Sequence, residues 1–336
     1  MTHAPRTRFL HVANGTCTTH LVESAGIPGT LSIWADPLHG GPVPGGLRDD
    51  ELLEVRARHL AGPTGEAEVD PANDLRNWRA VIERHESYEE LVLWLEHDLF
   101  DQLNLIQLLT WIRERLPPAK VVSLVCVGSF PGHPRFKGLG ELSADELASV
   151  LETRQRVGEE QYSLARLAWQ AFREPTPVPL DALRRHDTSA LRHLAASIER
   201  FLQEYPWTTD RLSRTERRLL ELASAGTVDL SAAFPRMHDG EAVYHITDTS
   251  FTELATSLAR TSPPLHRLAP ERIPGAGLLQ GSVTLTDFGR AVLAGHEDRI
   301  ATCGIDRWLG GVHLDGNGAP WRWDDRRRTI TRDRRE

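Results

Sequence analysis

The sequence predicts an α/β protein with a short parallel sheet of about four strands flanked by helices, followed by a helical segment and a winged-helix-like domain. In the first 130 residues, short apolar runs of strand length alternate with helical patterns. That alternation is typical of a parallel sheet with helices on its faces. From residue 143 the pattern becomes helical, and two strand-like runs return only between residues 265 and 285.

Four apolar runs are the predicted strands of the sheet. They comprise residues 8–13, 30–34, 90–95 and 120–127. Right-handed crossovers are the rule for such units, and we expect the strand order 2-1-3-4. The switch point would then lie between the first and third strands, and ligands bind in open α/β sheets at the carboxyl ends of the strands around that point.

Helices are expected between these strands at residues 18–25, 50–60, 71–84 and 99–115. The last of them carries no charged residue between Asp101 and Arg113 and is apolar around most of its circumference, which predicts a buried helix. Its Asn104 and Gln107 should therefore lie inside the protein with hydrogen-bond partners.

The second half divides into three predicted parts, residues 143–205, 206–300 and 301–336, after an α/β ligand-binding domain at 1–142. Capping-box patterns at residues 143–146 and 213–216 mark helix starts. Helices near 214–226, 230–237 and 248–260, strands at 265–268 and 282–285, and a helix at 287–294 together suggest a winged helix-turn-helix. The Trp-rich tail should pack as a cover on another surface, with residues 326–336 frayed.

Composition limits the partners and the compartment. The net charge of −8 excludes a polycation, and from residue 206 onward there are 18 arginines and 18 acidic residues. A winged helix that binds DNA needs a basic recognition helix and wing. Because the charges from residue 206 onward balance, a role of this domain in packing or protein interaction is at least as well supported as DNA binding. The three cysteines are far apart, no secretory signal is visible, and no run approaches the roughly 20 apolar residues of a membrane span. We expect a cytoplasmic protein without membrane contact.

The candidate site lies where the third strand ends in Glu96-His97-Asp98. A carboxylate and an imidazole at the end of a buried strand are costly unless solvated or paired, so Glu96 and His97 form either a functional edge or a structural hydrogen-bond pair. Asp98 stands at the expected helix N-cap, so it is either only a capping residue or also part of the site, and the capping role alone would explain an Asp here. Asp101 and Gln102 follow in the first helical turn and are further candidate ligand-binding residues.

Two other loops are predicted to reach the same edge. His39 is either a solvated loop residue or an acid/base or metal ligand, and Asp36 could orient it or form an Asx turn. The ligand types would suit zinc, but they lack motif spacing, so we assign no metal, and the cofactor is unknown. Asn14-Gly15-Thr16 is either a simple turn or a set of phosphate-binding donors at a helix start. Ser129 could serve the same edge, but no G-x-S-x-G elbow supports a nucleophile.

Three segments resemble a bacterial family catalogued only as domain of unknown function 1835. They are residues 10–15 (LHVANG), 34–44 (WADPLHGGPVP) and 94–103 (WLEHDLFDQL), and residues 305–314 with 321–323 are similar to the ending of long family members. The first motif usually has Asp where Thr16 stands here. The resemblance implies a family but no activity.

Three functions remain open from the sequence. The favoured one is a hydrolase or group-transfer enzyme that acts on a small anionic or nucleotide-like ligand, with His39 and His97 as acid/base groups and Glu96 as base or orienting group. The alternatives are a ligand-sensing winged-helix DNA regulator and a non-enzymatic interaction module, which would have side chains filling the edge. The oligomeric state is not predicted.

Overall fold

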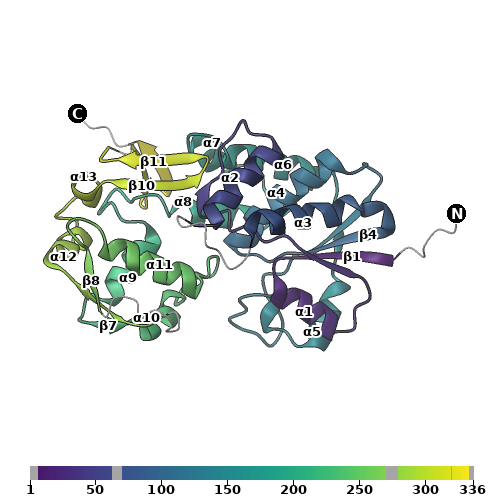
Figure 1. Cartoon of the computed structure of the whole chain (residues 1–336), viewed down its shortest axis with the longest axis horizontal. Coiled ribbons are helices and arrows are strands. Elements are labelled where there is room, and N and C mark those ends of the chain that lie inside the picture. Colours follow the sequence, from purple (N-terminus) through teal and green to yellow (C-terminus); the bar gives the residue numbers. More distant parts are fainter. Residues whose placement is uncertain (1–6, 63–69, 270–278, 319, 333–336) are drawn as a thin grey trace. The chain divides into compact units, whose positions relative to one another are not determined.

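The computed structural model describes residues 7–62, 70–269, 279–318 and 320–332 (Figure 1). The chain divides into two compact units, which are described separately below. The first comprises residues 1–198 with 310–312, and the second comprises residues 199–309 with 313–336.

The first unit is built on a five-stranded sheet in the order β2-β1-β4-β5-β6. Its strands are β1 (Thr7–Ala13), β2 (Thr30–Ile33), β4 (Tyr88–Trp94), β5 (Val121–Val125) and β6 (Gln155–Arg156). The first four are parallel, and their order confirms the predicted order 2-1-3-4 with its switch point between β1 and β4. The sequence did not indicate β6, which pairs antiparallel with β5, because two residues are too few to show strand periodicity.

Helices cover both faces of this sheet. Figure 1 shows α1 and α5 on one face and α2, α3, α4 and α6 on the other. Their bounds are α1 (Thr16–Ser24), α2 (Asp49–Leu60), α3 (Pro71–Glu83), α4 (Leu99–Arg115), α5 (Ala144–Leu151) and α6 (Glu159–Phe172). The remaining elements are the short strand β3 (Gly41–Pro42), α7 (Val178–Leu183), and α8 (Leu194–Leu202), which contains the boundary between the units.

Helix α4 is buried along nearly its whole length, as its uniform apolarity predicted. Gln107 accepts a hydrogen bond from the indole N–H of Trp34 at 2.9 Å. Asn104 accepts from the backbone N–H of Asp36 at 3.0 Å and donates to its carbonyl at 2.9 Å. The expectation that both amides lie inside with partners is confirmed, and they join the loop after β2 to the buried helix.

The second unit contains helices around a three-stranded antiparallel sheet in the order β7-β9-β8. Its elements are α9 (Arg214–Leu222), β7 (Val228–Asp229), α10 (Leu230–Met237), α11 (Asp248–Ala259), β8 (His266–Ala269), β9 (Ser282–Leu285), α12 (Asp287–Leu293) and α13 (Arg299–Cys303). Leucines of α9 pack with Phe251 of α11 and Val283 of β9 in one apolar core. These positions agree with the expected helices and hairpin, while the winged-helix assignment itself stays a prediction.

The C-terminal segment forms two hairpins, β10 (Ile305–Gly310) with β11 (Val312–Gly316), and β12 (Trp321–Asp324) with β13 (Thr329–Arg332). Trp323 is fully buried, and its backbone N–H donates to the Pro206 carbonyl at 2.9 Å. The prediction that the charged end is frayed is wrong for residues 329–332, because pairing with β12 satisfies their backbone groups. Residues 333–336 lie outside the described residues.

Within the described ranges, no helix combines the length and the apolarity that crossing a membrane requires.

Candidate functional site

The turns after β1 and β4 meet at Asp101 in the first turn of α4. The side-chain amide of Asn14 donates to Asp101 Oδ2 at 2.8 Å, and the backbone N–H of Glu96 donates to the same oxygen. Asn14 is itself held by the Thr18 hydroxyl at 2.6 Å. The structure therefore brings together Asn14, Glu96 and Asp101 at the switch point of the sheet.

Three carboxyl groups lie in this turn and influence one another. Asp98 caps α4 by accepting the N–H of Asp101 at 2.9 Å. Burial, reinforced by the charge of Asp98, raises the pKa of Glu96 to about 7, and burial raises the pKa of Asp98 to about 6. The pKa of the fully buried Asp101 is also raised, by desolvation and then by its two acidic neighbours. The cluster consequently retains protons close to neutral pH.

The Glu96 side chain points toward the loop after β5. Its Oε1 accepts the backbone N–H of Leu139 at 2.7 Å, and its side chain leaves no room for a Cβ at Gly138. Gln102 of α4 donates to the Glu96 carbonyl at 2.6 Å. Glu96 thus ties the strand end to the turn Leu139–Glu141, and only 7% of the residue is exposed.

His97 lies between two other rings. Its centroid is 6.4 Å from Phe136 in a stacked arrangement and 5.9 Å from His193 in an edge arrangement. A Cβ at Gly128 would lie 2.8 Å from His193 Cε1 and 3.2 Å from His97 Cβ. A side chain at position 128 would therefore require the His193 ring to move.

His193 and its neighbour Arg192 belong to this edge, although no motif in the sequence points to them. Burial first, and then the charges of Arg192 and His97, lower the pKa of His193 to about 4. Arg192 Nε donates to His193 Nε2 at 3.0 Å, so the neutral imidazole carries its proton on Nδ1. They follow β4 by about 100 residues in a helical segment without a motif, so no sequence signal connected them with His97.

A cavity of about 330 Å³ opens beside these residues. Gln102, Cys126, Arg192 and His193 line it, together with Leu124, Thr153 and others. Arg192 is exposed, and its Nη2 donates to the Cys126 carbonyl at 2.8 Å. Burial raises the pKa of Cys126 to about 12, so its side chain is a thiol and not a thiolate nucleophile.

The loop after β2 places its two predicted site residues in different surroundings. Asp36 is buried and pairs with Arg56, whose Nη2 lies 2.7 Å from Asp36 Oδ1. Its carboxylate is thus engaged by a guanidinium and is not positioned as a free orienting group for His39. His39 is half-buried and its ring centroid lies 6.1 Å from that of Phe100, in the first turn of α4.

The remaining predicted residues border the edge. Gly15 stands at the N-cap position of α1, where its carbonyl accepts the N–H of Thr19 at 3.2 Å. Thr16 and Ser129 are exposed. Among the described residues, no group of three or more His, Cys, Asp or Glu side chains is arranged to hold a metal ion.

No protein-family model matches the chain, and no curated protein matches it. The similarity of three N-terminal segments to domain of unknown function 1835 therefore stays a resemblance of motifs.

Proposed function

We propose that the first unit binds a small anionic ligand at the carboxyl edge of its sheet and acts on it as a hydrolase or group-transfer enzyme. The observation that supports this most is the 330 Å³ cavity lined by Arg192 and His193, beside the predicted His97. A volume of this size is within the range of small-molecule sites. A non-enzymatic packing module would instead have side chains filling this edge.

Each group has a proposed role. The exposed guanidinium of Arg192 would bind a phosphate or carboxylate through paired N–H donors. His97 would exchange a proton with the ligand, and His193 would offer the Nδ1–H of a neutral imidazole. A pKa of about 7 suits Glu96 for holding and releasing a proton near neutrality, while Asn14 and Asp101 position its backbone. His39, Gly15, Thr16 and Ser129 remain proposed contacts at the rim of this edge.

The test is a thermal-shift screen with nucleotides, sugar phosphates and divalent ions, followed by assay of product release for each compound that binds. A ligand at a hundred times its dissociation constant adds roughly 2.7 kcal/mol of stability. Arg192→Gln should weaken binding at least about tenfold, which corresponds to about 1.4 kcal/mol. Arg166→Gln, an exposed arginine outside the cavity, is the matched control.

Two further variants address the chemistry. Glu96→Gln and His97→Ala should lower turnover more than they lower ligand affinity, because proton transfer is lost while the arginine remains. If both variants leave affinity and turnover unchanged, the proposal is wrong.

The alternative of a DNA-binding regulator has less support. Arg214 lies 3.3 Å from Glu241, and Arg217 pairs with Asp210. Guanidinium groups already engaged by carboxylates are poorly suited to neutralise DNA phosphates.

A further inference from the structure

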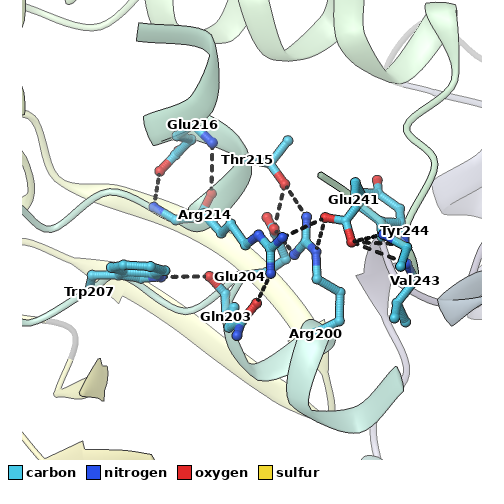
Figure 2. Close-up of polar contacts among 12 residues, drawn as sticks. Arg200, Gln203, Glu204, Trp207, Arg214, Thr215, Glu216, Glu241, Val243 and Tyr244 are labelled. Atoms are coloured by element: carbon cyan, nitrogen blue, oxygen red, sulfur yellow. Dashed lines mark hydrogen bonds and ion pairs between the residues drawn. The ribbon is translucent and has the colours of Figure 1, made fainter. Parts of the chain in front are cut away.

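The second unit contains a larger cavity of about 1060 Å³ that the proposed function does not use. It lies along one side of α9 and includes residues of the turn between β12 and β13. Figure 2 shows part of its wall, where Arg200, Arg214 and Glu241 converge from separate segments. The volume is at the upper end of the range for small-molecule sites.

Part of this wall is a saturated ionic network. Arg200, which is 5% exposed, donates to Glu241 at 2.7 Å and to Glu204 at 2.6 Å. Glu241 Oε1 also accepts three consecutive backbone N–H groups, from residues 242–244 (Figure 2). The carboxylates of Glu204 and Glu241 therefore already have hydrogen-bond partners within the unit. We do not expect this part of the wall to contact the ligand directly.

Of the two neighbouring arginines of α9, Arg218 is the less completely engaged, because Arg217 donates to the Thr209 hydroxyl at 2.9 Å and also pairs with Asp210. Arg218 donates through Nη2 to the Arg236 carbonyl at 2.9 Å, and its nearest carboxylate, Asp239, is 4.0 Å away with 68% of its side chain exposed. The Nε atoms of both Arg217 and Arg218 are buried and have no hydrogen-bond partner among the described residues. Buried charged donors without an acceptor are costly and rare in folded proteins.

The acidic residues of the lining do not supply those acceptors. Asp210 is buried, pairs with Arg217 through a terminal nitrogen, and accepts the N–H of Leu212 at 3.0 Å. Glu221 has 44% of its side chain exposed and lies 4.0 Å from Arg217 Nη1. The exposed rim carries charges of both signs, since Arg327 lies there beside the acidic side chains. The Nε donor of Arg218 in the buried wall, unpartnered among the described residues, suits a ligand that accepts hydrogen bonds inside the cavity.

We infer that this cavity binds a small molecule carrying phosphate or carboxylate oxygens, held chiefly by the guanidinium group of Arg218, whose carboxylate neighbour Asp239 is 4.0 Å away. The planar fork of arginine matches such oxyanions and gives two parallel hydrogen bonds.

Isothermal titration of the full chain with inorganic pyrophosphate and with citrate tests the inference and distinguishes the two sources of oxyanion. At least one probe should bind saturably at or below about 1 mM. Arg218→Gln should weaken that binding about tenfold or more, and Arg218→Lys should restore only part of it, because a lysine keeps the charge but not the fork. Circular dichroism establishes that each variant is folded.

The matched control is Arg267→Gln, an exposed arginine of β8 that does not line the cavity. Arg192→Gln should remove only a binding component that belongs to the first unit and leave the Arg218-dependent component unchanged, so failure of the proposed function and failure of this inference are distinguishable. Absence of saturable binding by both probes would overturn the inference. The inference would also be overturned if the wild type and Arg218→Gln bound the probes equally well. The same holds if Arg218→Gln weakened binding to duplex DNA but not to either probe.

Discussion

Glu96 shows how one residue can be both a structural link and a candidate proton carrier. Its backbone joins Asp101 and Gln102, and its carboxyl group accepts the N–H of Leu139. Water is nearly excluded from it, since the residue is 7% exposed. Ionising such a group costs free energy. Between about pH 4.5 and pH 7, the folded chain therefore holds a proton on Glu96 that the unfolded chain has already released.

This difference predicts a pH dependence. The pKa of Glu96 is about 7 in the folded protein against an ordinary value of 4.5, so the free energy of unfolding should fall as pH rises between these two values. Glu96→Gln keeps an oxygen acceptor for Leu139 and cannot titrate. Its unfolding free energy, measured by urea denaturation from pH 4.5 to 7.5, should fall less steeply, by roughly 3 kcal/mol across the range. Glu152→Gln, at an exposed position, should follow the wild type, and equal slopes for Glu96→Gln would contradict the prediction.

Among the elements, α4 positions the site by being buried on almost every side. Its N-terminus carries Asp98 and Asp101 at the edge of the sheet, and its middle holds the loop after β2 through Asn104. A helix with so little amphipathic character depends on its polar side chains finding internal partners. Gln107 meets that need by accepting the Trp34 N–H.

Gln107→Leu should consequently lower the free energy of unfolding by about 1–3 kcal/mol, because the buried indole N–H of Trp34 loses the Gln107 oxygen as its acceptor. Urea denaturation followed by circular dichroism measures the change. Gln170→Leu on α6, where the glutamine is exposed, should stay close to the wild type. A Gln107→Leu variant as stable as that control would mean that the hydrogen bond contributes nothing.

For the molecule as a whole, charge limits what it can bind. The net charge is −8, and the part from residue 206 onward balances 18 arginines against 18 acidic residues. Several of those arginines are paired inside the second unit, as with Arg214 and Glu241. Binding to DNA depends on neutralising backbone phosphates with free cationic groups.

We therefore expect the full chain to bind a labelled DNA duplex no more tightly than the non-specific range of about 10⁻⁴–10⁻⁶ M at physiological salt. Fluorescence anisotropy over a series of salt concentrations measures this. Nanomolar affinity with a steep salt dependence, reduced by Arg214→Gln or Arg218→Gln but not by Arg267→Gln, would instead establish the DNA-binding alternative.

The sequence by itself determined the alternation of strands and helices and the burial of α4, because hydrophobic periodicity is a local property. It also placed Glu96 and His97 at the end of a central strand. The order of the parallel strands was an expectation that the structure confirmed. Only the tertiary structure decided that Asp36 pairs with Arg56, that His193 and Arg192 join His97, and that α9 faces a cavity. Those contacts join segments far apart in the chain, and no spacing within a segment encodes which distant side chain will fill the space beside it.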